Sequence, residues 1–488
     1  MTADYLGLAR ALLPETALVF GALVVLGFDL VAGRRFTPEA RVRANAVIAI
    51  LALLSALTGS LAAGLPGPVF GGVLMLDSLA LATRLGVVTL ALLTVTLCAG
   101  TLRQKQPAEF FAIVLFATAG FTLMAAAQQL LLIFLAIELA SISLYVLAGF
   151  DAKRPESAEA AMKYFLFGGM SAAFLLFGFS LLYGLTGTIK LDEIAIQLAH
   201  QGMTPLLTIA LVMVIVAFGF KAAAAPFHLW APDVYEGAPV SSAALIASAS
   251  KLAGFMVFVR LLWGGLGYST GAATTSHLVA GWIPVLAMVA AASLLLGNLA
   301  ALAQTNLRRL LAYSAIAHAG AMLLGVIAAG RAGPAPLFYY VATYGLATVG
   351  TFGVIAVAEN AGACRNITDL AGLHRRSPLL AGCLLLFVLS LAGIPPLAGF
   401  FGKFTVFAAA LQSGGLTSLV GWLAVLAIFL SAVALYYYLI ILKQALVVAP
   451  PANASKITVP PAAAFALLVT AGLLILFGLA PSLLLGLF

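Results

Sequence analysis

The sequence predicts an all-α polytopic membrane protein with about fourteen transmembrane helices. Of its 488 residues, 64% are hydrophobic and only 8% are charged, whereas a soluble domain carries roughly 25% charged residues. Apolar stretches of about twenty residues, long enough to cross the hydrocarbon core, follow one another from Ala11 to Leu484. The alternating pattern of a membrane β-barrel is absent from the sequence. These observations exclude a water-soluble fold and favour a single transmembrane domain over 1–488.

The predicted spans follow the apolar stretches in chain order. They cover 11–32, 43–63, 73–98, 108–126, 128–150, 160–184, 205–227, 239–262, 278–300, 308–329, 336–358, 378–412, 418–445 and 462–486. The twelfth span, 378–412, is too long for one straight crossing, because a helix of that length reaches about 50 Å against a core of about 30 Å. Pro395 and Pro396 fall in its middle. The twelfth span is therefore predicted to be a broken helix.

Positive residues in the loops predict the orientation of the bundle. The even-numbered loops, their edges and the N-terminus hold four, namely Arg10, Lys190, Arg260 and Arg331. The odd-numbered loops hold fifteen: Arg34, Arg35, Arg41, Arg43, Arg103, Lys105, Lys153, Arg154, Arg308, Arg309, Arg365, Arg375, Arg376, Lys443 and Lys456. Because cytoplasmic loops carry the excess of Lys and Arg, both termini are expected on the non-cytoplasmic side.

Five of the 24 basic residues fall inside the predicted spans: Arg84, Lys163, Lys221, Lys251 and Lys403. A charge at the centre of a bilayer costs at least about 2.5–3.5 kcal/mol on insertion scales, so it indicates a functional site. One acid, Glu138, lies near the centre of the fifth span. Lys221 precedes Pro226 by five residues, and Lys403 follows the proline pair of the twelfth span by seven. Glu138, Lys221, Lys251 and Lys403 are therefore the candidates for a proton path.

Lysine suits proton relay because burial disfavours its charged form and a nearby carboxylate favours it. We therefore expect Glu138 to modulate Lys221. Lys251 is expected to relay the proton at the centre, and Lys403 to pass it onward. The purely structural alternative is a static salt bridge between Glu138 and Lys221, but one acid cannot neutralise three buried lysines.

Two proline breaks predict an internal repeat. GFKAAAAPFHLW interrupts the seventh span and AGIPPLAGFFGKF interrupts the twelfth, five spans later. Transporters place discontinuous helices at matching positions of their repeats. We expect one five-helix repeat over 108–262 and a second, inverted one over 278–445.

Other polar residues are weaker candidates. His228 follows the first break and His318 lies inside the tenth span. Either histidine suits proton relay, although a lone buried histidine is often only a hydrogen-bonded residue of the protein interior. Three further pairs admit structural interpretations. These are a local salt bridge between Glu159 and Lys163, pairing or snorkelling of Asp77 and Arg84, and capping or interface roles for Asp233 and Glu236, for which proton conduction is equally open.

Four segments give the chain a resemblance to a known family. They are ALLPE at 11–15, AIELASISLYVLAGF at 136–150, SLAGIPPLAGFFGKF at 390–404 and the highly specific GFKAAAAPFHLWAPDVYEGAPVSSAALIASASKLAGF at 219–255. With these segments the whole chain resembles the antiporter-like subunits of the respiratory proton-pumping NADH:quinone oxidoreductase, complex I. DVYEGAP makes it most similar to the subunit N family.

This resemblance implies a fourteen-helix fold with inverted repeats and proton-channel roles for Glu138, Lys221, Lys251 and Lys403. It implies that electrons pass from NADH to quinone through other subunits, which hold FMN and the iron–sulfur clusters, while this chain binds no cofactor or metal. It also implies subunits K and M as neighbours, and a location in the bacterial inner membrane.

Three other functions remain open from the sequence, one of which is a purely structural scaffold. A subunit of a multisubunit cation/proton antiporter would share the fold and the buried lysines, although DVYEGAP argues against it. A separate transporter for an organic solute would need a roomy pocket in the middle of the membrane, whereas the sequence offers mainly a thin line of charges.

Overall fold

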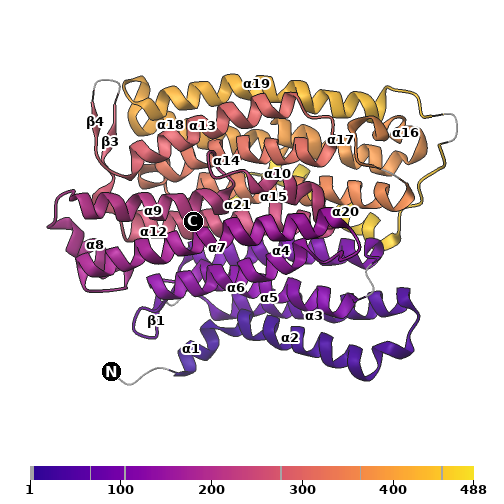
Figure 1. Ribbon diagram of the computed structural model, residues 1–488, viewed down its shortest axis with the longest axis horizontal. Helices are drawn as coiled ribbons and strands as arrows, with labels where there is room; N and C mark the ends of the chain where they lie inside the picture. Colours follow the sequence, from indigo (N-terminus) through magenta and orange to yellow (C-terminus); the bar gives the residue numbers. More distant parts are fainter. Residues whose placement is uncertain (1–4, 66, 104–105, 275–276, 363, 452–453) are drawn as a thin grey trace.

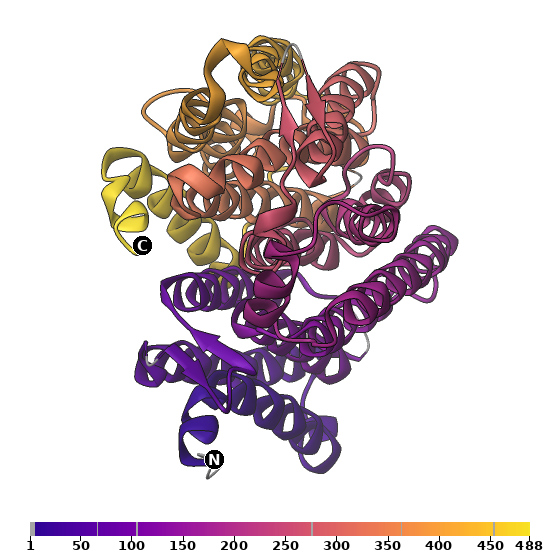
Figure 2. The ribbon, with the colours of Figure 1, turned by 90° about the vertical axis from the view of Figure 1, so that its left-hand side faces the viewer.

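The computed structural model describes residues 5–65, 67–103, 106–274, 277–362, 364–451 and 454–488. Long helices lie side by side along one direction and form a single elongated bundle (Figure 1). Seen from the end of this bundle, the N-terminal helices lie on one side and the later helices on the other (Figure 2). Lys105, one of the residues used to predict orientation, lies outside the described residues.

The N-terminal half holds α1 (Tyr5–Ala11), α2 (Leu13–Val31), α3 (Pro38–Ala63), α4 (Ser78–Thr101), α5 (Pro107–Ala126), α6 (Leu130–Ala148), α7 (Pro155–Thr186), α8 (Leu191–Ala199), α9 (Pro205–Ala222), α10 (Trp230–Gly237), α11 (Val240–Ala247) and α12 (Ala249–Gly264). The C-terminal half holds α13 (Trp282–Leu302), α14 (Leu307–Ala332), α15 (Ala335–Ala361), α16 (Leu373–Arg376), α17 (Pro378–Ala392), α18 (Ala398–Gly414), α19 (Leu419–Leu446), α20 (Pro461–Leu479) and α21 (Ser482–Leu485).

Short elements connect these helices. Single 3₁₀ turns lie at η1 (Gly33–Arg35), η2 (Gly267–Ser269), η3 (Ile367–Leu370) and η4 (Gly415–Thr417). Two antiparallel hairpins pair β1 (Gly67–Val69) with β2 (Leu74–Leu76) and β3 (Ala272–Ala273) with β4 (Leu278–Val279). The hairpin of β3 and β4 and helix α8 lie at one end of the bundle, and α16 lies at the other (Figure 1).

The fourteen-span prediction is confirmed. Within the described residues, thirteen helical segments are long and apolar enough to cross a membrane, counting α11 and α12 together. The shorter helices α17 and α18 form the broken twelfth span, which is interrupted between Ala392 and Ala398 as the sequence predicts. The seventh span was predicted to reach residue 227, but α9 ends at Ala222, because Ala223 adopts a left-handed conformation (φ 57°).

Burial distinguishes central helices from peripheral ones. The most apolar windows of α11–α12 and of α15 are completely buried, whereas only one third of the corresponding windows of α3 and α7 is buried. Large apolar side chains such as Phe20, Phe165 and Phe429 are exposed on peripheral helices. Exposed apolar side chains of this kind suit a surface that faces lipid or another membrane subunit.

Candidate functional site

The three lysines predicted from the sequence lie on three different helices in the interior of the bundle. Lys221 on α9, Lys251 on α12 and Lys403 on α18 are buried, and Lys251 is only 2% exposed. Among the described residues, none of the three has a carboxylate within ion-pair distance. Each ammonium group instead donates a hydrogen bond to a neutral oxygen. Neutral partners stabilise a charged lysine less than a carboxylate does.

Lys221 lies in the last turn of α9, where the helix is interrupted. Its Nζ donates to Ser141 Oγ on α6 at 3.1 Å. The backbone groups freed by the break find partners nearby: Trp230 Nε1 donates to Phe220 O at 3.0 Å, and Ala225 N–H donates to Ser293 Oγ at 2.8 Å. Irregular backbone inside a membrane protein requires such internal partners. The break at the seventh span therefore places Lys221 against polar groups without leaving these backbone groups unpaired.

Lys403 also lies beside a break, on the helix that follows the interruption of the twelfth span. Its Nζ donates to Ala392 O, at the C-terminal end of α17, at 2.9 Å. The last carbonyls of a helix lack intrahelical partners and carry partial negative charge. Gly393 ends α17 with φ 86°, and a Cβ at this position would meet Lys403 Cδ at 2.9 Å. The twelfth-span break thus supplies both an acceptor for the ammonium group and space for its stem.

A third helix break was not predicted from the sequence. The eighth span is divided into α11 and α12 at Ser248, which has φ −116° and ψ −82°. Ser248 Oγ donates to Ala244 O at 2.6 Å, and such back-bonding by serine weakens and bends helices. Lys251 lies three residues later, and its Nζ donates to Ala315 O on α14 at 2.7 Å. The run of serines at 241–250 was the only sequence signal for this break.

Glu138 is half-buried on α6. It lines a cavity with an empty volume of about 300 Å³ together with Ser141 and Lys221. Glu138 and Lys221 are not within ion-pair distance, so the structure does not contain the static salt bridge considered from the sequence.

Lys221 and Lys251 both line a second cavity, with an empty volume of about 190 Å³, whose other walls are apolar. Beyond Lys251, polar groups continue toward the second half of the chain. The Lys251 ammonium lies 5.5 Å from the centroid of the Tyr344 ring, and Tyr344 and Ser314 line a third cavity of about 220 Å³. Lys251 therefore lies between Lys221 and the third cavity.

His318 connects that third cavity to Lys403. The hydroxyls of Ser314 and Tyr438 are hydrogen-bonded, and Tyr438 Oη lies 3.1 Å from His318 Nε2. The other ring nitrogen of His318 lies 2.7 Å from Tyr340 Oη. His318 and Lys403 line a common cavity of about 270 Å³. Sequence reasoning identified the histidine but missed the tyrosines, although Tyr340 and Tyr344 have the i, i+4 spacing that places both on one helix face.

His228 lies apart from this series. Its side chain is buried, and its Nδ1 has no hydrogen-bond partner among the described residues. It does not line any of the four cavities that contain the other candidates. The structure therefore places only one of the two predicted histidines beside the lysines.

The remaining buried cations belong to ion pairs. Arg84 is 1% exposed and donates to Glu15 at 2.8 Å. The expected pairing of Asp77 with Arg84 is wrong, because Asp77 accepts two hydrogen bonds from Arg260, at 2.7 and 3.1 Å. Partners this far apart in the chain cannot be recognised from local spacing.

Lys163 pairs with Glu159 at 2.6 Å as predicted, and also with Asp233 on α10 at 2.6 Å. Asp233 in turn accepts a hydrogen bond from Arg309 at 2.7 Å. Partial burial opposes ionisation of Asp233, but the hydrogen bonds from Lys163 and Arg309 outweigh it and hold its pKa below the ordinary value. Asp233 thus lies at the interface between α10 and α14.

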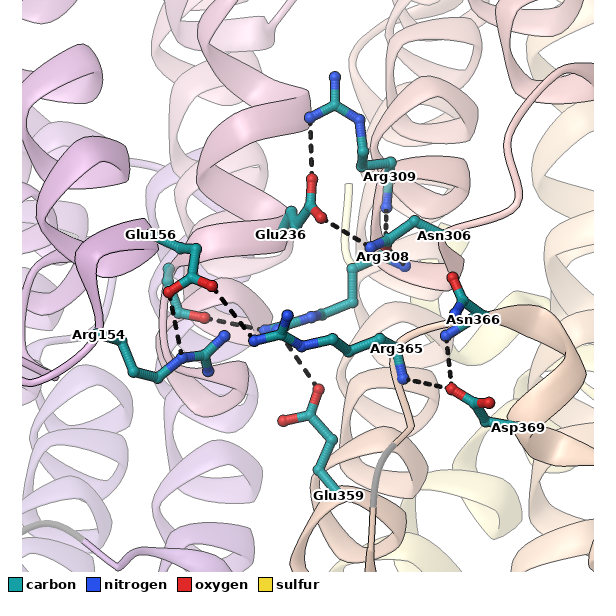
Figure 3. Close-up of polar contacts among 11 residues, drawn as sticks. Arg154, Glu156, Glu236, Asn306, Arg308, Arg309, Glu359, Arg365, Asn366 and Asp369 are labelled. Carbon is teal, nitrogen blue, oxygen red and sulfur yellow. Dashed lines mark hydrogen bonds and ion pairs between the residues drawn. The ribbon is translucent and has the colours of Figure 1, made fainter.

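Figure 3 shows the adjoining part of this interface. Glu236 accepts hydrogen bonds from Arg309 at 2.9 Å and from Asn306 at 2.8 Å. Arg308 donates to Ala238 O at 3.0 Å and lies 3.4 Å from Glu359. The DVYEGAP segment therefore joins α10 of the first half to the start of α14 in the second, and its Tyr235 packs against Phe352 of α15 with ring centroids 5.8 Å apart.

Comparisons with known proteins agree with this geometry. The family model described as "NADH:quinone oxidoreductase/Mrp antiporter, TM" matches residues 127–433. NADH-quinone oxidoreductase subunit N 2 of Acidobacterium capsulatum is 50% identical, over 99% of this chain and 98% of the relative. Subunit N 1 of Roseiflexus castenholzii is 40% identical, over 89% of this chain and 83% of the relative. The chain belongs to the subunit N family.

Solved structures extend this result. A chain of respiratory complex I from Thermus thermophilus is 35% identical, with a TM-score of 0.79 over 97% of this chain and 98% of that one. A chain of the Mrp complex from Dietzia sp. also has a TM-score of 0.79, over 100% of this chain and 96% of that one, but only 22% identity. The second likeness shows the fold alone. This subunit N is therefore a membrane subunit of NADH-quinone oxidoreductase, as the resemblance implied.

Proposed function

We propose that this subunit N moves protons across the membrane, in coupling to electron transfer that takes place in other subunits. The observation that carries the proposal is the series of cavities between Glu138 and Lys403. Lys221 lines the first cavity and the second, Lys251 lines the second, and His318 shares the last with Lys403. A cavity needs roughly 10–15 Å³ of free volume and polar partners to hold a water, and the ammonium, hydroxyl and imidazole groups that line these small cavities are such partners.

The proposed proton transfer depends on how strongly the neighbours of each lysine stabilise its protonated form, which differs along the series. Lys221 has a carboxylate across its cavity, whereas Lys251 and Lys403 have backbone carbonyls as acceptors. A change in the distance between Glu138 and Lys221 alters the stability of the protonated lysine. Lys221 then gives its proton toward Lys251, and the hydroxyls of Ser314 and Tyr438 with His318 connect Lys251 to Lys403. We include His228 in the proposed path only as a lower-ranked relay.

The first prediction concerns Lys221→Ala and Lys403→Ala in the assembled oxidoreductase. Proton pumping into inverted membrane vesicles should fall severalfold, because each substitution removes a proton-accepting group from the series. Lys153→Ala, which removes an exposed cation from a loop, is the matched control and should pump normally. Normal pumping by both path variants, in fully assembled enzyme, would falsify the proposal.

We further propose that 108–262 and 278–445 are two inverted repeats within a single domain, 1–488. The odd number of spans in each repeat supports inversion, because the second repeat then begins from the opposite side of the membrane. We propose that this subunit binds no cofactor of its own and that FMN, iron–sulfur clusters and quinone belong to the parent complex. Subunits K and M are its proposed neighbours, on the strength of the resemblance.

The second prediction concerns orientation in the bacterial inner membrane, with both termini on the non-cytoplasmic side. A cysteine at Lys153→Cys should react with a membrane-impermeant maleimide only from the cytoplasm. A cysteine at Tyr268→Cys, which is 70% exposed in wild type, should react only from the opposite side. The three native cysteines are buried and give little background. If each cysteine reacted only from the other side, the bundle would have the opposite orientation, with both termini in the cytoplasm.

A further inference from the structure

A large open crevice lies away from the lysine series, at the end of the bundle that carries α16. It has an empty volume of about 2380 Å³ including its mouth. Its walls are α3, the end of α4, the end of α15 and the segment that enters α20. Ile457 N–H donates to Arg376 O at 3.0 Å, which fixes that segment beside α16. Nothing in the proposed proton path uses this crevice.

The mouth of the crevice is positively charged. Arg43, Arg103 and Lys456 line it, with Glu39 as the single acid among its lining residues. Three cations and one acid leave two positive charges. Among the described residues, none of the three cations has a carboxylate within ion-pair distance. Arg103 donates to the backbone oxygen of Asn360 at 2.8 Å, so its guanidinium is held at the mouth.

The deeper walls are apolar. Val42, Ala46, Val47 and Ile50 of α3 line the crevice, and so do Ala99 and Gly100 of α4. From Pro38 to Ile50 the α3 wall extends for about 18 Å, which is close to the roughly 15 Å of hydrocarbon in one leaflet. A crevice with cations at its mouth and one leaflet of apolar wall matches a phospholipid in both charge and depth.

We propose that this crevice binds an anionic phospholipid. Its phosphate lies against Arg43, Arg103 and Lys456, and one acyl chain lies along α3 toward Ile50. Basic pockets between helices on the cytoplasmic side are suited to anionic headgroups, and the loop charges predict that this end faces the cytoplasm. The lipid fills the space between α3 and the entry of α20, so it stabilises the attachment of the N-terminal helices to the rest of the bundle.

The test uses the intact oxidoreductase, reconstituted in nanodiscs of equal parts phosphatidylglycerol and phosphatidylcholine. After extraction into detergent, native mass spectrometry counts the lipids retained by wild type, by Arg43→Gln/Lys456→Gln and by Lys153→Gln/Arg375→Gln. The last variant removes two exposed cations that do not line the crevice. Wild type and control should retain at least one phosphatidylglycerol that the crevice variant loses.

A second variant tests the apolar wall. Val47→Trp places a large side chain at a position that is 54% exposed on α3, and it should also lose the retained phosphatidylglycerol while the headgroup cations are intact. Equal retention by wild type and both crevice variants would overturn the proposal. So would a crosslink from a photoreactive residue at position 47 to another subunit in place of lipid.

Discussion

At the scale of single residues, the charged groups divide into paired and unpaired sets. Arg84 has Glu15 as an ion-pair partner, whereas Lys221, Lys251 and Lys403 donate to neutral oxygens. A paired buried charge stabilises a fold only while its partner remains. The sequence showed that these groups are intramembrane charges, but it could not show which acid pairs with which base, because the partners are brought together by helix packing.

The third prediction follows for the pair between Arg84 and Glu15. Arg84→Met should destabilise the subunit by about 3–5 kcal/mol, because it leaves a buried carboxylate without its cation. The double variant Glu15→Gln/Arg84→Met should recover much of that loss. Thermal unfolding of the purified complex measures both effects. An unchanged unfolding temperature in Arg84→Met would show that the pair does not stabilise the bundle.

At the scale of elements, the helix breaks determine where the lysines lie. Proline marked two breaks in the sequence, at 226 and at 395–396, and both are present. The break at Ser248 has neither proline nor glycine, so sequence periodicity predicted one continuous helix there. The end of α9 at Ala222 also depends on the left-handed conformation of Ala223, which alanine rarely adopts and which its sequence context did not indicate.

The fourth prediction concerns the break in the twelfth span. Gly393→Ala should cost about 1–2 kcal/mol, because alanine is strained at positive φ, and its Cβ would also displace the stem of Lys403. Proton pumping should fall together with stability. Gly382→Ala on the same helix has open space around its Cβ and is the control. Normal pumping by Gly393→Ala would show that this glycine does not position the lysine.

At the scale of the whole molecule, the lysine series crosses from the first half of the chain to the second. The number of spans and the four principal ionisable residues could be predicted because apolar length and buried charge are visible in sequence. The tyrosine and serine hydroxyls beside His318 could not, because such residues are common in apolar helices and their positions depend on the contacts between α14, α15 and α19.

The most direct test of the proton path is the number of protons moved per NADH oxidised. Lys251→Met removes the central group but keeps an unbranched side chain of similar length in the same buried space. The complex carrying it should assemble, and it should translocate fewer protons per NADH than wild type when both are measured in sealed vesicles. An unchanged ratio in the assembled complex would contradict the claim that protons pass through Lys251.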